Sequence, residues 1–117
     1  MNDIERKHTN ARMSKIVQHG GLIFLCGQTS SGSSAADIDA QTREALSRID
    51  ALLAEAGSDR SRLLSVTVHL KSMSDFAKMN ACWEGWLAGV AAPARTTVQA
   101  ALATEDLLVE FTVTAAS

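Results

Sequence analysis

The chain has 117 residues, of which 46% are apolar and 21% charged, so we expect residues 1–117 to form a single folded domain. This composition excludes disordered and low-complexity chains. A formal net charge of −2 with scattered basic residues does not favour nucleic-acid binding. No apolar run approaches the roughly 20 residues of a membrane helix, and the N-terminus is unlike a signal peptide. We therefore predict a cytoplasmic protein.

The N-terminal half predicts strands followed by one helix. A short strand is expected near residues 5–9, and Gly20 and Gly21 mark a turn that joins strands at 14–19 and 22–26. The Ser- and Gly-rich stretch 29–36 predicts a flexible loop, because it lacks the Gly-Lys-Ser/Thr ending of a phosphate-binding loop. Apolar residues at three- and four-residue steps after Asp37 then predict a helix, capped by Asp37 and ended by Gly57.

The C-terminal half predicts one helix among three strands. Alternation over residues 64–70 indicates a strand, and a helix follows from a Ser74 or Asp75 cap to Gly89, with Trp83 in the core. Period-two patterns at residues 97–102 and 107–114 flank a polar turn. We predict that these two strands pair as an antiparallel hairpin, in which Val98 faces Phe111.

These elements predict an α+β fold, with two helices packed on one face of a sheet. Residues 22–25 are apolar on both strand faces, which is typical of a strand buried from both sides. Two helices cover only one face of the sheet, so we expect a second copy of the chain to cover the other.

The hairpin register gathers polar side chains on the face opposite the helices. It places Arg95 near Thr114, Thr97 near Thr112, and Gln99 near Glu110. Arg95 follows Pro93 at the start of a strand, where a guanidinium can bind a carboxylate through two hydrogen bonds. The alternative is a structural ion pair between Arg95 and Glu110. Glu110 itself can activate a water, hold an ammonium group, or form half of an interface ion pair.

Metal and nucleophile motifs are absent from the sequence. Cys26 and Cys82 have apolar neighbours and no Cys-x-x-Cys spacing, so they are expected to be buried, reduced thiols. The three histidines show no zinc-ligand spacing, and no dinucleotide fingerprint is present. We therefore expect neither a metal nor a cofactor.

Five segments together resemble the RidA family, also called YjgF, and within it the YoaB-like branch. They are Gly27-Gln28 after an apolar strand, Ile49–Gly57 before a strand, Asp75-Phe76…Met79-Asn80, Pro93-Ala94-Arg95-Thr96 and Val109-Glu110-Phe111. The resemblance implies a chorismate-mutase-like fold with a mixed six-stranded sheet. It also implies a homotrimer with three ligand clefts between subunits.

The resemblance further implies cofactor-free hydrolysis of reactive 2-imino acids to 2-keto acids and ammonia. Arg95 then binds the substrate carboxylate, and Gly27, Thr97 and Asn80 complete the substrate-binding set. Arg95, Glu110 and Thr112 form the candidate catalytic set. By the hairpin register predicted above, Thr112 lies diagonally across from Arg95, where its hydroxyl can orient a water.

Three departures from the family pattern bear on this activity. Thr112 stands where deaminases of the family have a second acid, and Thr97 stands where they have a cysteine. The chain also contains no tyrosine, whereas a tyrosine lines many of those pockets. Two alternatives therefore remain: a trimeric small-carboxylate-binding or regulatory protein with little catalysis, and an endoribonuclease or translation inhibitor, which the acidic charge balance disfavours.

Overall fold

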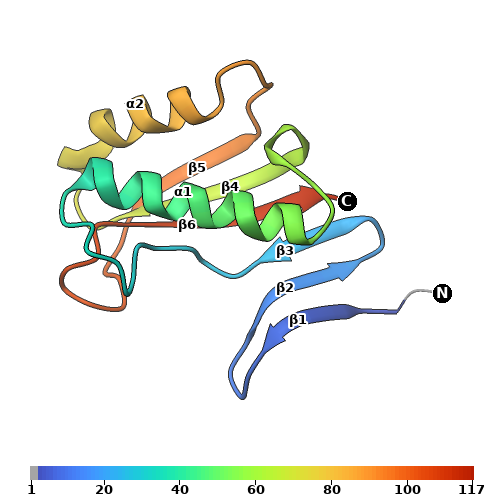
Figure 1. Cartoon of the computed structure of the whole chain (residues 1–117). Helices are drawn as coiled ribbons and strands as arrows, with labels where there is room; N and C mark the ends of the chain where they lie inside the picture. The colour runs from blue at the N-terminus through green and yellow to red at the C-terminus, as the bar shows by residue number, and fades with distance from the viewer. Residues whose placement is uncertain (1–2) are drawn as a thin grey trace.

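The computed structural model describes residues 3–117, which form one six-stranded sheet with two helices on the same side of it (Figure 1). Along the chain the elements are β1 (Glu5–Thr9), β2 (Ser14–His19), β3 (Leu22–Leu25), α1 (Ile38–Glu55), β4 (Leu63–Leu70), α2 (Phe76–Trp86), β5 (Ala94–Gln99) and β6 (Val109–Ala116). Short 3₁₀ turns, η1 (Arg60–Arg62) and η2 (Met73–Asp75), precede β4 and α2. The predicted α+β architecture is therefore confirmed.

Helix α1 forms where the sequence predicts it. The Asp37 side chain accepts a hydrogen bond from the Ala40 amide at 2.8 Å, which satisfies one of the free N–H groups of the first turn. Ala45, Ile49 and Leu53 are fully buried at four-residue steps, and they place one face of the helix on the sheet. Gly57 ends the segment with a φ of +80°, a conformation that glycine adopts without strain.

The hairpin of β2 and β3 is also confirmed, because Gly20 and Gly21 form its turn with positive φ angles. Within β3, Ile23 and Leu25 are buried under the helices. Leu22 and Phe24 point to the opposite face and are 38% and 44% exposed. The chain itself therefore covers only one side of this apolar strand.

The predicted pairing of residues 97–102 with 107–114 is wrong. Strand β5 ends at Gln99 and runs parallel to β4, with Arg95 beside Val66, while β6 pairs antiparallel with β4 and places Phe111 beside Val68. Strand β4 thus separates the two strands, in the order β1-β2-β3-β6-β4-β5. The sequence β4–α2–β5 is a strand–helix–strand crossover, and such a connection joins parallel neighbours.

The core lies between the helices and the covered face of the sheet. Trp83 of α2 is 5% exposed and stacks on Phe111 of β6, with ring centroids 5.9 Å apart. Val66, Val68 and Val113 of the central strands are buried beside this pair. The sequence-based placement of Trp83 in the core is confirmed, and the aromatic pair fixes α2 above the central strands. In the part of the chain that the structure describes, no helix is both long and apolar enough to cross a membrane.

Candidate functional site

Arg95 lies on β5, the edge strand that follows Pro93. It pairs with Val66, whose side chain is buried under the helices, so the Arg95 side chain also points to the helix-covered face. Its guanidinium carbon lies 5.4 Å from the ring centroid of Trp83 and 5.8 Å from that of Phe76. Both distances are within the range of cation–π attraction, so the two rings of α2 hold the guanidinium in place.

Arg95 has no acidic partner within residues 3–117. The ion pairs in this range involve other basic groups, those of His8, Arg48, Arg60 and Lys71. The alternative ion pair of Arg95 with Glu110 does not form, because Glu110 pairs with His69 and points to the uncovered face of the sheet. A half-buried guanidinium without an acid can bind the carboxylate of a ligand.

Two more predicted residues lie near Arg95. Thr97 projects from the same face of β5 beside Val68, and its buried hydroxyl has no hydrogen-bond partner among residues 3–117. Asn80 is half-buried on α2, four residues after Phe76 and three before Trp83, on the helix side that carries both rings. Arg95 and Thr97 thus share one face of β5, and Asn80 lies on the side of α2 that carries the two rings beside Arg95.

Glu110 and Gly27 form a separate cluster. A side chain at position 27 would collide with the Glu110 carboxylate, so this approach requires glycine. The paired backbone bonds between Gln28 and Phe111, at 2.8 and 3.0 Å, fix the segment beside β6. Gly27 and Glu110 are therefore neighbours, on the opposite face of the sheet from the Arg95 side chain.

The Cys26 thiol belongs to this second cluster. Burial raises the pKa of Cys26, and the charge of Glu110 raises it further, although Lys15 and the hydrogen bond from Gln28 oppose the change. The Gln28 side-chain amide donates to the sulfur at 3.2 Å. Cys26 is therefore a free thiol that is neutral at neutral pH. The side chain is half-buried, whereas the sequence predicted a buried one.

The predicted placement of Thr112 is wrong. Thr112 pairs with Thr67 of β4 and is exposed on the uncovered face, two residues from Glu110. It does not lie diagonally across from Arg95, because β4 intervenes and the two side chains point to opposite faces. Likewise, Arg95 does not adjoin Thr114, and Gln99 does not adjoin Glu110; instead the Gln99 side chain accepts a hydrogen bond from the Met73 amide at 2.9 Å.

The aromatic support of Arg95 was not predicted from the sequence. Trp83 was expected only in the core, whereas the structure also places Phe76, which is 36% exposed, beneath the guanidinium. The seven-residue spacing of these rings signals that they share one side of α2. The spacing points to a contact with Arg95 only when β5 is known to lie beneath the helix.

Comparisons with known proteins agree with this fold. The family described as "Endoribonuclease L-PSP" matches residues 4–117. The RutC family protein YoaB of Escherichia coli K12 is 37% identical over 113 residues, which cover 97% of each chain. A RutC family protein of Haemophilus ducreyi is also 37% identical over 113 residues, covering 97% of this chain and 96% of the relative.

Solved structures extend the similarity to the whole architecture. NMB1025 of Neisseria meningitidis, a member of the YjgF protein family, superimposes with a TM-score of 0.91 at 39% identity, covering 98% of this chain and 95% of that one. The YjgF gene product of E. coli has a TM-score of 0.84 at 28% identity, covering 92% and 90%. The chain therefore belongs to the RutC/YjgF family, also described as Endoribonuclease L-PSP.

Proposed function

We propose that the protein is a homotrimeric, cofactor-free hydrolase that converts small 2-imino acids to 2-keto acids and ammonia. The observation that carries this proposal is the Arg95 guanidinium, which two aromatic rings hold at an edge strand without an acidic partner among residues 3–117. The planar guanidinium of an arginine matches a carboxylate through two parallel hydrogen bonds. Arg95 therefore binds the carboxylate that 2-imino and 2-keto acids share.

The chemical step requires little from the protein. The carbon of a protonated imine is already electrophilic, so orienting the substrate and one water supplies most of the acceleration. The water oxygen bonds to that carbon and gives up one proton, which forms a carbinolamine whose amino nitrogen is then protonated. The carbon–nitrogen bond breaks to release ammonia as the hydroxyl loses its proton and becomes the carbonyl of the 2-keto acid. Glu110 is the acid of the candidate set that can accept the proton of the attacking water.

The two faces of the sheet determine how this site is assembled. Arg95 points to the covered face and Glu110 to the uncovered face of the same chain. A cleft that contains both groups therefore takes Arg95 from one copy and Glu110 from a neighbouring copy. The exposed Leu22 and Phe24 side chains support such an assembly, because they leave an apolar surface that the chain does not cover.

The direct test generates 2-iminobutyrate with an amino-acid dehydratase and follows release of 2-ketobutyrate. Wild-type protein should accelerate release, and Arg95→Ala should not. Arg12→Gln is the matched control, because Arg12 lies in the β1–β2 turn and its loss leaves the candidate site intact. If Arg95→Ala remains as active as wild type while folded, the proposed function is wrong.

A second candidate function is carboxylate binding with little catalysis, and Thr112 favours it. Its hydroxyl can orient a water but is a poor acceptor for the water's proton. Saturable binding of 2-ketobutyrate without faster imine hydrolysis would support this candidate. In that case Thr112→Glu should raise the hydrolysis rate and leave 2-ketobutyrate affinity within a few fold.

Ribonuclease activity, which the family description names, is the third function to test. The net charge of −2 is unfavourable for binding a polyanion such as RNA. We expect no cleavage of single-stranded RNA under conditions in which imine hydrolysis is measured.

A further inference from the structure

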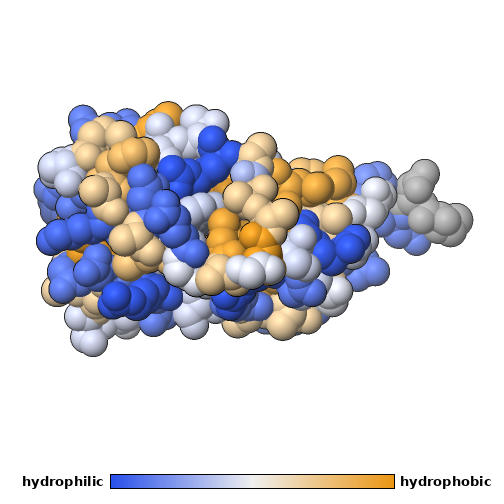
Figure 2. All heavy atoms as spheres, turned by 90° about the horizontal axis from the view of Figure 1, so that it is seen from above, coloured by the Kyte–Doolittle hydropathy of each residue, from blue (hydrophilic) through white to orange (hydrophobic). Residues whose placement is uncertain are grey.

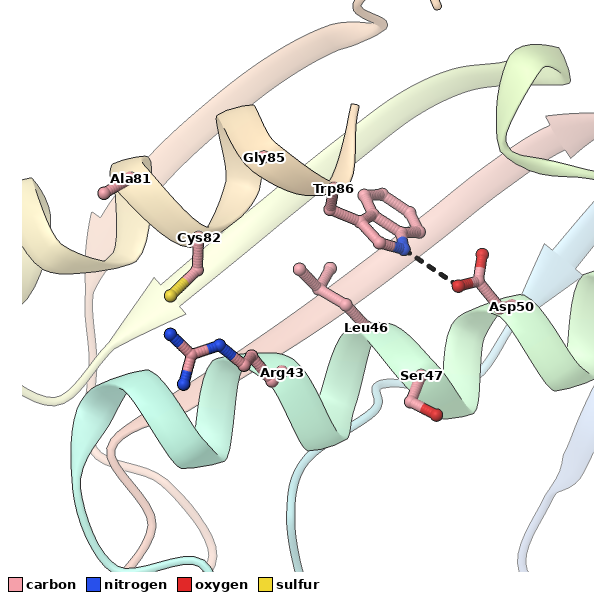
Figure 3. Close-up of a pocket in the computed structure, with 8 residues that line it drawn as sticks. All are labelled: Arg43, Leu46, Ser47, Asp50, Ala81, Cys82, Gly85 and Trp86. Carbon is pink, nitrogen blue, oxygen red and sulfur yellow. Dashed lines mark hydrogen bonds between the residues drawn. The ribbon is translucent and has the colours of Figure 1, made fainter. Parts of the chain in front are cut away.

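A groove with a volume of about 390 Å³ runs between α1 and α2 (Figure 3). Arg43, Leu46 and Asp50 line it from α1, and Cys82, Gly85 and Trp86 line it from α2. None of the candidate residues of the imine-hydrolase site lines this groove. Its volume lies in the range of small-molecule pockets, roughly 300 to 1,000 Å³.

The Trp86 wall is held rigidly before any ligand binds. The indole Nε1 donates to Asp50 Oδ2 at 3.0 Å, as the dashed line in Figure 3 shows. The Arg60 guanidinium binds the same carboxylate at 2.7 and 3.2 Å, and its carbon lies 5.0 Å from the Trp86 ring centroid. Asp50 is therefore neutralised, and the indole presents a fixed apolar surface to the groove.

Gly85 leaves the groove open without serving the fold. A Cβ atom at this position would meet nothing within 4 Å, and its φ is not positive. Alanine would therefore fit and would favour the helix. A glycine in the last turns of α2 costs helix stability, while it preserves space directly beside Trp86.

Arg43 places a positive charge, without an acidic partner in residues 3–117, at the end of the groove away from Trp86. Within the described residues its guanidinium forms no ion pair or side-chain hydrogen bond, and Figure 3 shows it pointing towards the sulfur of Cys82. Asp39 lies nearby, with Oδ1 3.8 Å from that sulfur, but does not pair with Arg43. Burial raises the pKa of Cys82, and Asp39 adds to the effect, so the thiol is a neutral part of the wall.

We propose that this groove binds a small aromatic carboxylate, with its ring between Leu46 and Trp86 and its carboxylate on Arg43. The apolar walls and the single available cation specify a ligand with an apolar body and one negative charge. The site is independent of the proposed imine hydrolysis, since it shares no residue with the Arg95 cluster.

The test measures binding of 3-phenylpropionate by calorimetry in Arg95→Ala protein, which removes the other candidate carboxylate site. We expect saturable binding of the acid. The affinity should be about tenfold or more weaker for the neutral amide of the same acid, and weaker by a similar factor when Arg43→Gln is added. Gly85→Leu should abolish binding by filling the groove. Arg12→Gln, which removes a remote positive charge, should leave the affinity unchanged.

Absence of saturable binding in the Arg95→Ala protein would overturn the proposal. Equal affinity for the acid and its amide would do the same, because Arg43 would then contribute nothing. A third contradictory result would be a Gly85→Leu protein that still binds the probe and whose mass, measured by sedimentation, differs from that of wild type. The groove would then be a contact between subunits. Circular dichroism of each variant ensures that these outcomes refer to folded protein.

Discussion

The two faces of the sheet differ in what the chain provides for them. The covered face is complete, because α1 and α2 bury its valines and the Trp83–Phe111 stack. The other face exposes Phe24 of β3 and Val98 of β5 together with a row of threonines. Seen from above, the visible side of the molecule mixes apolar and polar surface (Figure 2).

The two faces therefore contribute to different properties of the protein. Residues under the helices stabilise one chain, whereas the proposed chemistry requires groups from both faces and hence from two chains. Substitutions on the two faces should therefore have different effects, one on folding and the other on assembly and activity.

The largest expected effect is on ligand binding at Arg95. Two charge-assisted hydrogen bonds contribute about 1.5 to 3 kcal/mol each, so Arg95→Ala should weaken 2-ketobutyrate binding by about 100-fold or more. Arg95→Lys should also bind poorly, because lysine keeps the charge but lacks the planar fork. Calorimetry on folded protein measures both. Undiminished affinity in Arg95→Ala would contradict the assignment of the carboxylate site.

Trp83→Ala should give the largest loss of stability. The side chain is buried and stacked on Phe111, so its removal should lower the free energy of unfolding by about 3 to 5 kcal/mol. Val98→Ala is the matched control on the uncovered face, where the side chain is 40% exposed, and should change stability by less than about 1 kcal/mol. Denaturant titrations compare the two. Equal effects would show that the faces do not differ as described.

Phe24→Ser should act on assembly rather than on folding. The Phe24 ring is 44% exposed on β3, so the isolated chain loses little packing when it is removed. Light scattering of wild type should give about three times the chain mass, and the variant should shift towards the monomer. A monomeric wild-type protein at micromolar concentration would refute the expected trimer.

A pair of glycine substitutions should have small effects of opposite sign. Gly27→Ala introduces a methyl group against the Glu110 carboxylate and should lower the melting temperature. Gly85→Ala meets no atom within 4 Å and should raise the free energy of unfolding by about 0.5 to 1 kcal/mol. In Gly27→Ala, a second substitution, Glu110→Ala, should recover part of the loss. The absence of any recovery would argue against the clash.

Local signals in the sequence predicted much of the fold. Asp37 and Gly57 delimit α1, and Gly20-Gly21 fixes the β2–β3 hairpin, because a capping side chain and a positive φ act within a few residues. The predicted pairing of β5 was wrong because strand pairing depends on residues far apart in the chain. Apolar alternation shows which face a strand buries but not which strand lies beside it, and β4 satisfies the pattern as well as β6 does.

For the candidate site too, local sequence identified residues, but it did not identify which residues lie beside one another. The Pro-Ala-Arg segment singles out Arg95, whereas the contact between Gly27 and Glu110 was not predicted. The face onto which Arg95 projects depends on its register with Val66, which lies 29 positions earlier in the chain. The same long-range register separates Thr112 from Arg95, so the predicted contact between them was wrong.

Subunit complementation tests the shared site most directly. Arg95→Ala and Glu110→Gln are each expected to be inactive as pure proteins. Equal amounts, unfolded and refolded together, should form mixed trimers in which about one quarter of the clefts combine an intact Arg95 with an intact Glu110. We predict that imine hydrolysis reappears at about that fraction of the wild-type rate. If the mixture stays inactive although mixed trimers form, Arg95 and Glu110 do not meet across subunits.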